Sequence, residues 1–234
     1  MYIVSLSFDD GFEKSNHKIA EIYEKYGLSA CFNVMALADG LVSKPTAHIY
    51  DPEAMPGNFD LWNEFRARGH EIMPHGLVHH NLTEIPFTEA QRSVLRCLDI
   101  FEWNLKGFHR HEAVYNFAFN AHTPTLESWL LTQVRAIRVR GADIINPLPD
   151  SHTRMVNTTG FGPENCEAYL ENTLETLFAR PSGWLVFTAH GLDNEGWGPM
   201  RSSYLEDLLV RLLDRNVLIM PVGQALDWAH KKGV

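Results

Sequence analysis

Short apolar runs alternate with longer amphipathic segments along the whole chain. Runs of roughly four to eight apolar and β-branched residues are typical of strands. They fall at 2–8, 29–35, 70–74, 114–119, 136–140, 153–157, 184–189 and 217–221. Strands separated by helical segments indicate a parallel sheet, so the pattern predicts an α/β fold with seven or eight mostly parallel strands.

The segments between these runs carry apolar residues at helical spacing and typical helix boundaries. Gly27 and Gly69 are expected to end helices, and Asn58 to cap the start of one. The predicted helices span 14–26, 58–68, 88–106, 123–134, 163–179 and 203–215, and a short final helix carries Trp228. No repeat, linker or low-complexity segment interrupts the alternation, which predicts one domain over residues 1–234.

Residues 36–57 interrupt the regular pattern. The stretch contains three prolines and two glycines and has no clear periodicity, so we expect a long loop insertion. Loops of this length in compact domains commonly act as lids or binding loops.

The charge of the chain argues against two classes of partner. Its 234 residues carry a formal net charge of −9, without a basic patch interleaved with aromatic residues. We therefore expect neither a nucleic acid nor an anionic membrane as partner. No apolar run approaches the ~20 residues that span a bilayer.

The ends and cysteines of the chain predict its location. The first residues already belong to the predicted strand at 2–8, so no signal peptide is expected. Cys31, Cys97 and Cys166 are scattered without metal-binding spacing, and we expect reduced thiols. These features predict a cytoplasmic protein and favour a small soluble substrate over a cell-wall polymer.

The first strand runs directly into two adjacent carboxylates, Asp9 and Asp10, followed by Gly11. Adjacent carboxylates repel each other, so burying both at a strand end is costly unless a positive charge lies beside them. A metal ion is the usual solution, with one Asp as ligand and the other free to take a proton. An ordinary Asp-Gly turn is the alternative.

Three histidines follow at the ends of later strands. His75 and His79 are four residues apart and can share one metal ion if the segment turns helically. His190 ends the strongly apolar strand at 184–189. In a parallel α/β fold, functional residues gather at the carboxyl ends of strands, so these groups are expected to meet.

Together these segments resemble the polysaccharide deacetylases, carbohydrate esterase family 4. Ser7-Phe8-Asp9-Asp10-Gly11 is similar to that family's first motif, Thr-Phe-Asp-Asp-Gly. The stretch from His75 to His79 resembles its His-(Ser/Thr)-x-x-His motif, with Gly76 in place of the hydroxyl residue. The resemblance implies the family's single-domain, distorted (β/α) barrel.

The resemblance also implies roles for the residues. Asp10, His75 and His79 are expected to bind a divalent metal ion, most simply Zn²⁺, although Co²⁺, Ni²⁺, Mn²⁺ and Fe²⁺ suit the same ligands. Asp9 is expected to be the general base that takes a proton from a metal-activated water, and His190 the general acid. The implied reaction removes an acetyl group from an N-acetylated, or less often O-acetylated, small sugar or oligosaccharide.

The third motif of the family is altered. The family usually has Arg-x-Pro-Tyr, whereas residues 117–122 read Phe-Ala-Phe-Asn-Ala-His. The Asn120 side chain and the Ala121 N–H are candidates for binding the oxyanion. Arg138 and Arg140 lie on one face of the next strand, and either can supply the missing cation. Trp197, in a glycine-rich loop after His190, is a candidate for stacking on the substrate or for anchoring the loop.

Two other functions remain open at this stage. A hydrolase of the same fold that acts on a cyclic ureide or imide, similar to allantoinases, fits the altered third motif and the expected location. A binding protein that has lost catalysis is the second alternative, against which the retention of all five expected site residues argues. The sequence does not determine an oligomeric state, and an oligomer is compatible with it.

Overall fold

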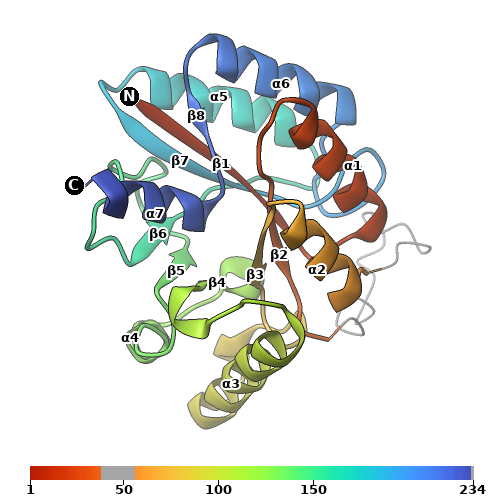
Figure 1. Ribbon diagram of the computed structural model, residues 1–234. Helices are drawn as coiled ribbons and strands as arrows, with labels where there is room; N and C mark the ends of the chain where they lie inside the picture. The colour runs from red at the N-terminus through yellow and green to blue at the C-terminus, as the bar shows by residue number, and fades with distance from the viewer. Residues whose placement is uncertain (38–55, 233–234) are drawn as a thin grey trace.

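The computed structural model describes residues 1–37 and 56–232. Its strands lie at the centre and its helices surround them, as expected for an α/β fold (Figure 1). Residues 38–55, which make up most of the predicted loop 36–57, lie outside the described part of the chain. None of the described helices is both long and apolar enough to cross a membrane.

Eight strands are described, and every pair among them is parallel, as predicted. They are β1 (Tyr2–Asp9), β2 (Cys31–Val34), β3 (Glu71–Pro74), β4 (Val114–Asn116), β5 (Ala136–Val139), β6 (Met155–Asn157), β7 (Gly183–Ala189) and β8 (Leu218–Ile219). One sheet has the order β3-β2-β1-β7 with β8 also on β1, and the other has the order β4-β5-β6.

Strand β1 is the centre of the larger sheet. Residues Tyr2 to Phe8 pair with β7 along one edge. The other edge is divided, because Ile3 and Val4 pair with β8 whereas Ser7 to Asp9 pair with β2. A strand that is covered on both faces and paired on both edges is mostly apolar, which explains the residues of β1 other than Ser5, Ser7 and Asp9.

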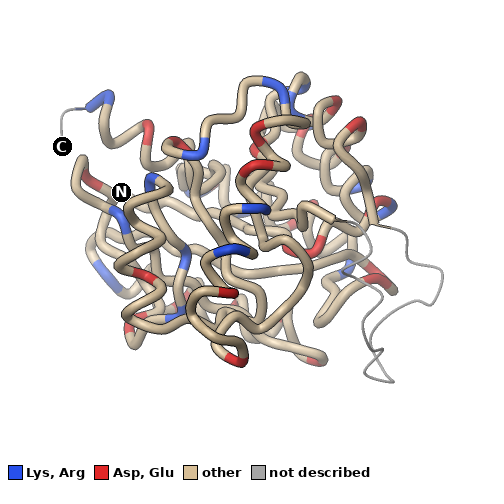
Figure 2. The backbone as a smooth tube through the Cα atoms, turned by 90° about the horizontal axis from the view of Figure 1, so that it is seen from below, with Lys and Arg blue, Asp and Glu red and all other residues tan. Residues whose placement is uncertain are grey.

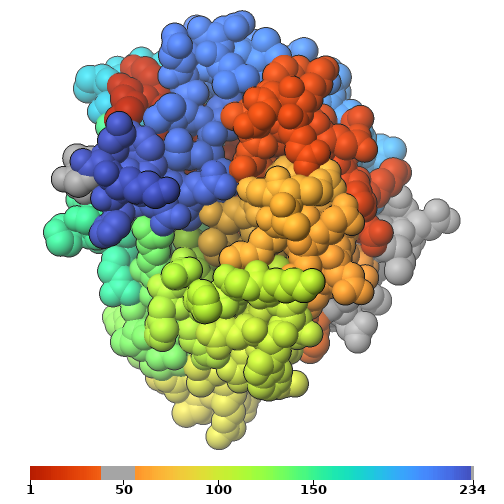
Figure 3. Space-filling view, in the orientation of Figure 1, coloured from red at the N-terminus to blue at the C-terminus, as the bar shows by residue number. Residues whose placement is uncertain are grey.

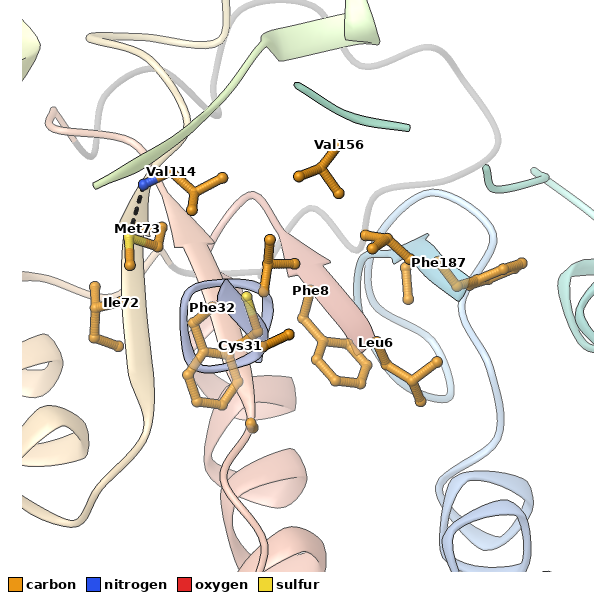
Figure 4. Close-up of a cluster of buried hydrophobic side chains, with 14 of the residues drawn as sticks. Leu6, Phe8, Cys31, Phe32, Ile72, Met73, Val114, Val156 and Phe187 are labelled. Atoms are coloured by element: carbon orange, nitrogen blue, oxygen red, sulfur yellow. Dashed lines mark hydrogen bonds between the residues drawn. The ribbon is translucent and has the colours of Figure 1, made fainter. Parts of the chain in front are cut away.

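The two sheets form an irregular barrel. Between β3 and β4 the Val114 N–H donates to the Met73 Sδ at 3.4 Å, where a regular barrel has a backbone ladder (Figure 4). On the far side, a single parallel bridge joins Thr159 to Phe187 in β7. The distorted (β/α) barrel is therefore confirmed, with its irregularity concentrated at these two seams.

Strand β4 is shorter than the sequence predicts. It ends at Asn116, whereas the apolar run predicted a strand to 119. Phe119 and Asn120 have φ of 58° and 50°, which is left-handed backbone that no strand accommodates. The chain turns there through a short 3₁₀ segment, Ala118–Asn120, directly above the barrel end.

Seven α-helices are described. They are α1 (Glu13–Lys25), α2 (Phe59–Ala67), α3 (Phe87–Asn104), α4 (Pro124–Leu130), α5 (Cys166–Phe178), α6 (Ser202–Asp214) and α7 (Val222–Lys232). Asn58 caps α2 as predicted, since its side chain accepts hydrogen bonds from the N–H groups of Asp60 and Leu61. The space-filling view shows α1 beside both α6 and α2 (Figure 3).

The core lies between the sheets and these helices. Leu6, Phe8, Phe32, Ile72 and Phe187 project from neighbouring strands and are almost completely buried (Figure 4). Each such side chain contributes roughly 1.5–3 kcal/mol when it leaves water. The apolar strand positions therefore form the layer between the strands and the helices, while polar residues of the same strands, such as Ser7, Asn33 and Arg138, are buried as well.

One carboxyl group is buried at the opposite end of the barrel. Glu71, the first residue of β3, accepts hydrogen bonds from the N–H groups of Gly223 at 3.0 Å and Gln224 at 3.1 Å, at the start of α7. The Cys31 thiol also donates to it at 3.5 Å. Burial raises the pKa of Glu71 to about 7, despite these hydrogen bonds. The C-terminal helix is thus attached to the barrel through this side chain.

The raised pKa of Glu71 predicts a pH-dependent contribution to stability. A folded-state pKa above the ordinary value of 4.5 means that the folded protein binds the proton more tightly, so the stability that this proton confers is lost as the pH rises towards 7. Between about pH 5 and pH 8, we expect the free energy of unfolding of the wild type to fall by roughly 1–3 kcal/mol more than that of Glu71→Gln, because the variant has no carboxyl proton to lose at this position. Urea denaturation at both pH values measures this difference.

The exposed Glu89 on α3 provides the matched control, because Glu89→Gln makes the same change in charge. Glu89→Gln is expected to retain the wild-type pH dependence. If Glu71→Gln and Glu89→Gln show the same pH dependence, Glu71 does not titrate as described.

Candidate active site

The end of β1 places two carboxylates in the same cavity. Asp9 is the last residue of β1, and Asp10 and Gly11 turn the chain sharply with φ of 77° and 81°. A Cβ at Gly11 would lie 3.1 Å from the ring of Trp62, and its φ also favours glycine. Both carboxylates are buried, at 2 % exposure each. The two carboxylates are therefore buried together, which is the condition under which the sequence predicts a metal ion beside them.

The two neighbouring histidines meet Asp10 without a helix. The chain bends after β3, and Gly76 has φ of 106°, so the segment from His75 to His79 does not turn helically. The bend nevertheless places Nε2 of His75 3.3 Å and Nε2 of His79 3.4 Å from Oδ1 of Asp10. The positive φ favours glycine at position 76.

These three side chains fit a metal ion. Their ligand atoms lie within 4.8 Å of one another. Oδ1 of Asp10 is buried and has no hydrogen-bond partner among the described residues, although such an atom normally has one. The Nδ1–H of His75 donates to the Asn116 carbonyl at 3.1 Å, which leaves the Nε2 lone pair facing Asp10. Two imidazoles and one carboxylate form the ligand set of many catalytic zinc sites.

Electrostatics favour the ionised carboxylate in this group. Burial opposes ionisation of Asp10, but the neighbouring His79 and His75 outweigh it and hold its pKa below the ordinary range. Burial lowers the pKa of His79, which favours the neutral imidazole that ligates metals. Burial acts in the same direction on His75, but the carboxylates of Asp9 and Asp10 reverse it and raise its pKa.

Arg138, from β5, binds Asp9. The arginine is fully buried, its Nη1 donates to Oδ1 of Asp9 at 2.8 Å, and its Nη2 donates to Oδ2. Asn33 donates a further hydrogen bond to Oδ1 at 2.7 Å. Burial alone would raise the pKa of Asp9, but the guanidinium outweighs it and lowers the pKa. Of the two arginines that the sequence left open, Arg138 therefore supplies the cation, from the strand after the one that carries the altered third motif.

His190 lies on the other side of the cavity, directly after β7. The ring of Trp197 packs edge-on against it, with the ring centroids 5.6 Å apart. The loop between them is held by Glu195, whose carboxylate accepts hydrogen bonds from the N–H of Ser15 at 2.8 Å and from its hydroxyl at 2.5 Å. Because Ser15 lies in the first turn of α1, which closely follows Asp10, this contact links the two sides of the site. The sequence contains no signal that distinguishes Glu195 from an exposed loop residue.

The cavity has a volume of about 350 Å³. Most of the residues expected at the site line it, namely Asp9, Asp10, His75, His79, Asn120, Arg140, His190 and Trp197. Ala121 does not, because its N–H donates to the Ala118 carbonyl at 3.1 Å, within the turn after β4. The expectation that the Ala121 N–H binds an oxyanion is therefore corrected.

Part of the cavity lining was not expected from the sequence. Phe119 packs on His79 with the ring centroids 4.2 Å apart and is 62 % exposed. Thr158 and Thr188 face the cavity from the opposite wall, with their hydroxyls 2.8 Å apart. Phe119 had seemed part of a strand, and threonines in strands are too common to attract notice.

Comparisons with known proteins agree with this geometry. The chain matches the family model described as polysaccharide deacetylase over residues 2–127, more than half of its length. The chain therefore belongs to the polysaccharide deacetylase family, as its motifs predicted. No curated protein matches it in sequence.

Solved structures of low sequence identity share the fold. The peptidoglycan deacetylase PdaC from Bacillus subtilis is 15 % identical, with a TM-score of 0.57 over 98 % of this chain and 92 % of that one. The catalytic domain of peptidoglycan N-acetylglucosamine deacetylase from Eubacterium rectale is 15 % identical, with a TM-score of 0.60 over 95 % and 89 %. A family 4 carbohydrate esterase from Streptomyces lividans, in complex with acetate, is 12 % identical, with a TM-score of 0.58 over 95 % and 94 %.

The burial of Arg138 predicts a large effect on stability. Replacing it with Met leaves the Asp9 carboxylate buried and unpaired, which typically costs about 3–5 kcal/mol. Arg140→Met, two residues further along, removes an exposed charge and is expected to change the free energy of unfolding by less than about 0.5 kcal/mol. Urea denaturation of the two variants compares them directly. Equal stabilities would contradict the assignment of Arg138 as the partner of Asp9.

Proposed function

We propose that this protein is a metal-dependent deacetylase that hydrolyses the acetyl amide, or less often an acetyl ester, of a sugar. The observation that carries the proposal is the buried, unpartnered Oδ1 of Asp10 between the two Nε2 atoms of His75 and His79. An anionic oxygen in that position is costly without a cation. Membership in the polysaccharide deacetylase family supports the same reaction.

Asp10, His75 and His79 are the residues that would hold the metal ion. Zn²⁺ suits two imidazoles and a carboxylate, and Co²⁺, Ni²⁺, Mn²⁺ and Fe²⁺ suit them as well. When bound, the ion supplies Lewis acidity, which polarises the acetyl carbonyl and acidifies water.

Asp9 acts as the general base. Arg138 keeps its carboxylate ionised and fixes its orientation, and Oδ2 lies 3.7 Å from Nε2 of His75, beside the metal ligands. From this position the carboxylate takes the proton of the attacking water. The second hydrogen bond, from Asn33, restricts the carboxylate further, so that little reorganisation accompanies the reaction.

His190 acts as the general acid. It faces the cavity from the side opposite the metal ligands, and Trp197 packs against its ring. It donates a proton to the departing nitrogen of the amide. An amine is a much poorer leaving group than an alcohol when unprotonated, so a positioned acid favours an amide as the main substrate.

The cavity suits a small ligand or one unit of an oligosaccharide. Its volume of about 350 Å³ lies near the lower end of the usual range for ligand pockets, roughly 300–1,000 Å³. Phe119 and Trp197 offer aromatic faces on either side of the site.

Cytoplasmic location remains a prediction, as does the absence of a nucleic-acid partner. The oligomeric state is likewise open.

A hydrolase of a cyclic ureide or imide is the second candidate. The observation that favours it is Asn120, which replaces part of the family's third motif and lines the cavity, and whose buried Oδ1 has no hydrogen-bond partner in the described part of the chain. An amide oxygen in this place can accept a hydrogen bond from a ring N–H. Screening the purified protein on N-acetylated sugars and on cyclic amides distinguishes the two reactions.

Metal content provides the most direct test. We expect about one zinc or similar ion per chain in the wild type, and loss of the ion in the double variant His75→Ala/His79→Ala, because two of three ligands are removed. Elemental analysis after dialysis measures this. The neighbouring His80 is exposed, so His80→Ala is the matched control and should retain the ion. A wild type that takes up no ion even from added zinc or cobalt would refute the mechanism.

Two substitutions test the acid and the base separately from the metal. His190→Ala and Asp9→Asn are each expected to lower kcat by about 10²–10⁴-fold, because each removes a proton-transfer group. Both variants should keep their metal ion, and the melting temperature checks that Asp9→Asn still folds. Turnover that is unchanged in both variants would assign the proton transfers to other groups, and a wild type without any turnover would favour the binding-protein alternative.

A further inference from the structure

One basic side chain lines the cavity without a carboxylate partner. Arg140 is the only Lys or Arg among the described residues of the cavity wall. It follows β5 directly, and strand alternation places its side chain on the same face as that of Arg138. Arg138 is fully buried behind Asp9, whereas Arg140 is exposed. The second guanidinium therefore lies nearer to the mouth of the cavity than the first.

The charges around Arg140 leave it available to a ligand. Acidic and basic residues are interspersed along the chain (Figure 2), and seven arginines of the described segments form ion pairs with carboxylates. Arg140 is not one of them. Neither of the carboxylates that line the cavity pairs with Arg140, since Asp9 binds Arg138 and Asp10 faces the two histidines. In a protein of net charge −9, an unneutralised cation beside the reacting groups is a distinctive feature.

The backbone beneath Arg140 is held in place. Its N–H donates to Nε2 of His122 at 3.3 Å, and the Nδ1–H of His122 in turn donates to Glu127 at 2.5 Å. A Cβ at the following residue, Gly141, would lie 2.2 Å from the Asn157 side chain. The chain thus presents the side chain from a fixed point, which reduces the entropy lost when a ligand binds.

We propose that Arg140 binds an anionic oxygen group of the substrate, a carboxylate or a phosphate, next to the bond that is cleaved. A guanidinium offers two parallel N–H donors that match the oxygens of either group. The inference rests on the proposed function and narrows it, because the preferred substrate is then an acid that carries an acetylated amine rather than a neutral acetylated sugar. The aromatic rings of Phe119 and Trp197 complete a site for a ring with one charged substituent.

Binding of matched ligands tests the proposal without turnover. The probes are N-acetylglucosamine, which is neutral, N-acetylmuramic acid, which is its carboxylate-bearing lactyl ether, and N-acetylglucosamine 6-phosphate. Calorimetry on the metal-loaded protein should show at least one acid binding about 10- to 100-fold more tightly than the neutral sugar, as expected for charge-assisted hydrogen bonds. The two acids separate a carboxylate site from a phosphate site.

Substitution of Arg140 should remove this preference. In Arg140→Gln the preferred acid should bind about as weakly as the neutral sugar, and Arg140→Lys should recover part of the difference. Arg92 on α3 is also exposed and lies outside the cavity wall, so Arg92→Gln makes the same change in charge and should retain the preference. A preference that survives in Arg140→Gln, or a wild type in which no acid binds more tightly than the neutral sugar, overturns the proposal.

The outcomes also separate this proposal from the proposed function. Turnover of acetylated sugars without any preference for an acid, or with the same preference for an acid in wild type and Arg140→Gln, would keep the hydrolase and reject the anion site. Acid binding that depends on Arg140, without turnover of any acetylated compound, would keep the anion site and reject the hydrolase.

Discussion

The buried ion pair between Arg138 and Asp9 is the interaction on which the rest of the site depends. Arg138 belongs to the smaller sheet and Asp9 to the larger one, so the pair crosses the barrel. Nη1 also donates to the Ser7 hydroxyl at 2.7 Å. Either charge alone would be buried at high cost, whereas together they are compensated. The same contact thus joins the two sheets, orients the carboxylate and keeps it ionised.

A buried polar network extends from this pair to the proposed metal ligands. Asn33 donates to Asp9 and accepts a hydrogen bond from Asn116 at 2.9 Å. The carbonyl of Asn116 accepts the Nδ1–H of His75. Strands β1, β2 and β4 are therefore connected through amide side chains. These contacts restrict the orientation of the Asp9 carboxylate and of the His75 imidazole. Such networks are costly when partly satisfied, and Oδ1 of Asp10, which has no hydrogen-bond partner among the described residues, is the point at which the proposed cation would complete this one.

The outer part of the cavity is built from groups that these contacts leave free. Glu195 and Ser15 attach the loop after β7 to the helix after β1, which sets the separation between His190 and the metal ligands. Phe119 and Arg140 then lie at the mouth, where they contact whatever enters. These residues at the mouth are the ones that we propose to distinguish substrates.

The sequence by itself determined the α/β barrel and the groups at its strand ends. Apolar runs specify strands, and parallel strands bring their carboxyl ends together, so Asp9, Asp10, His75, His79 and His190 were expected in one place before any coordinates. The choice between Arg138 and Arg140 needed the tertiary structure. Alternation puts both on one face but does not say which lies at the depth of Asp9.

The tertiary structure also decided the turn after β4 and the partner of Ser15. The local sequence predicted a strand to residue 119, yet left-handed backbone at Phe119 and Asn120 ends the strand early. In the resulting turn the N–H of Ala121 donates to the Ala118 carbonyl. Glu195 binds a residue 180 positions away, a pairing that no local pattern encodes. Hydrophobic periodicity records which face of an element is buried, but hydrogen bonds between distant loops depend on distances that exist only after the chain has folded.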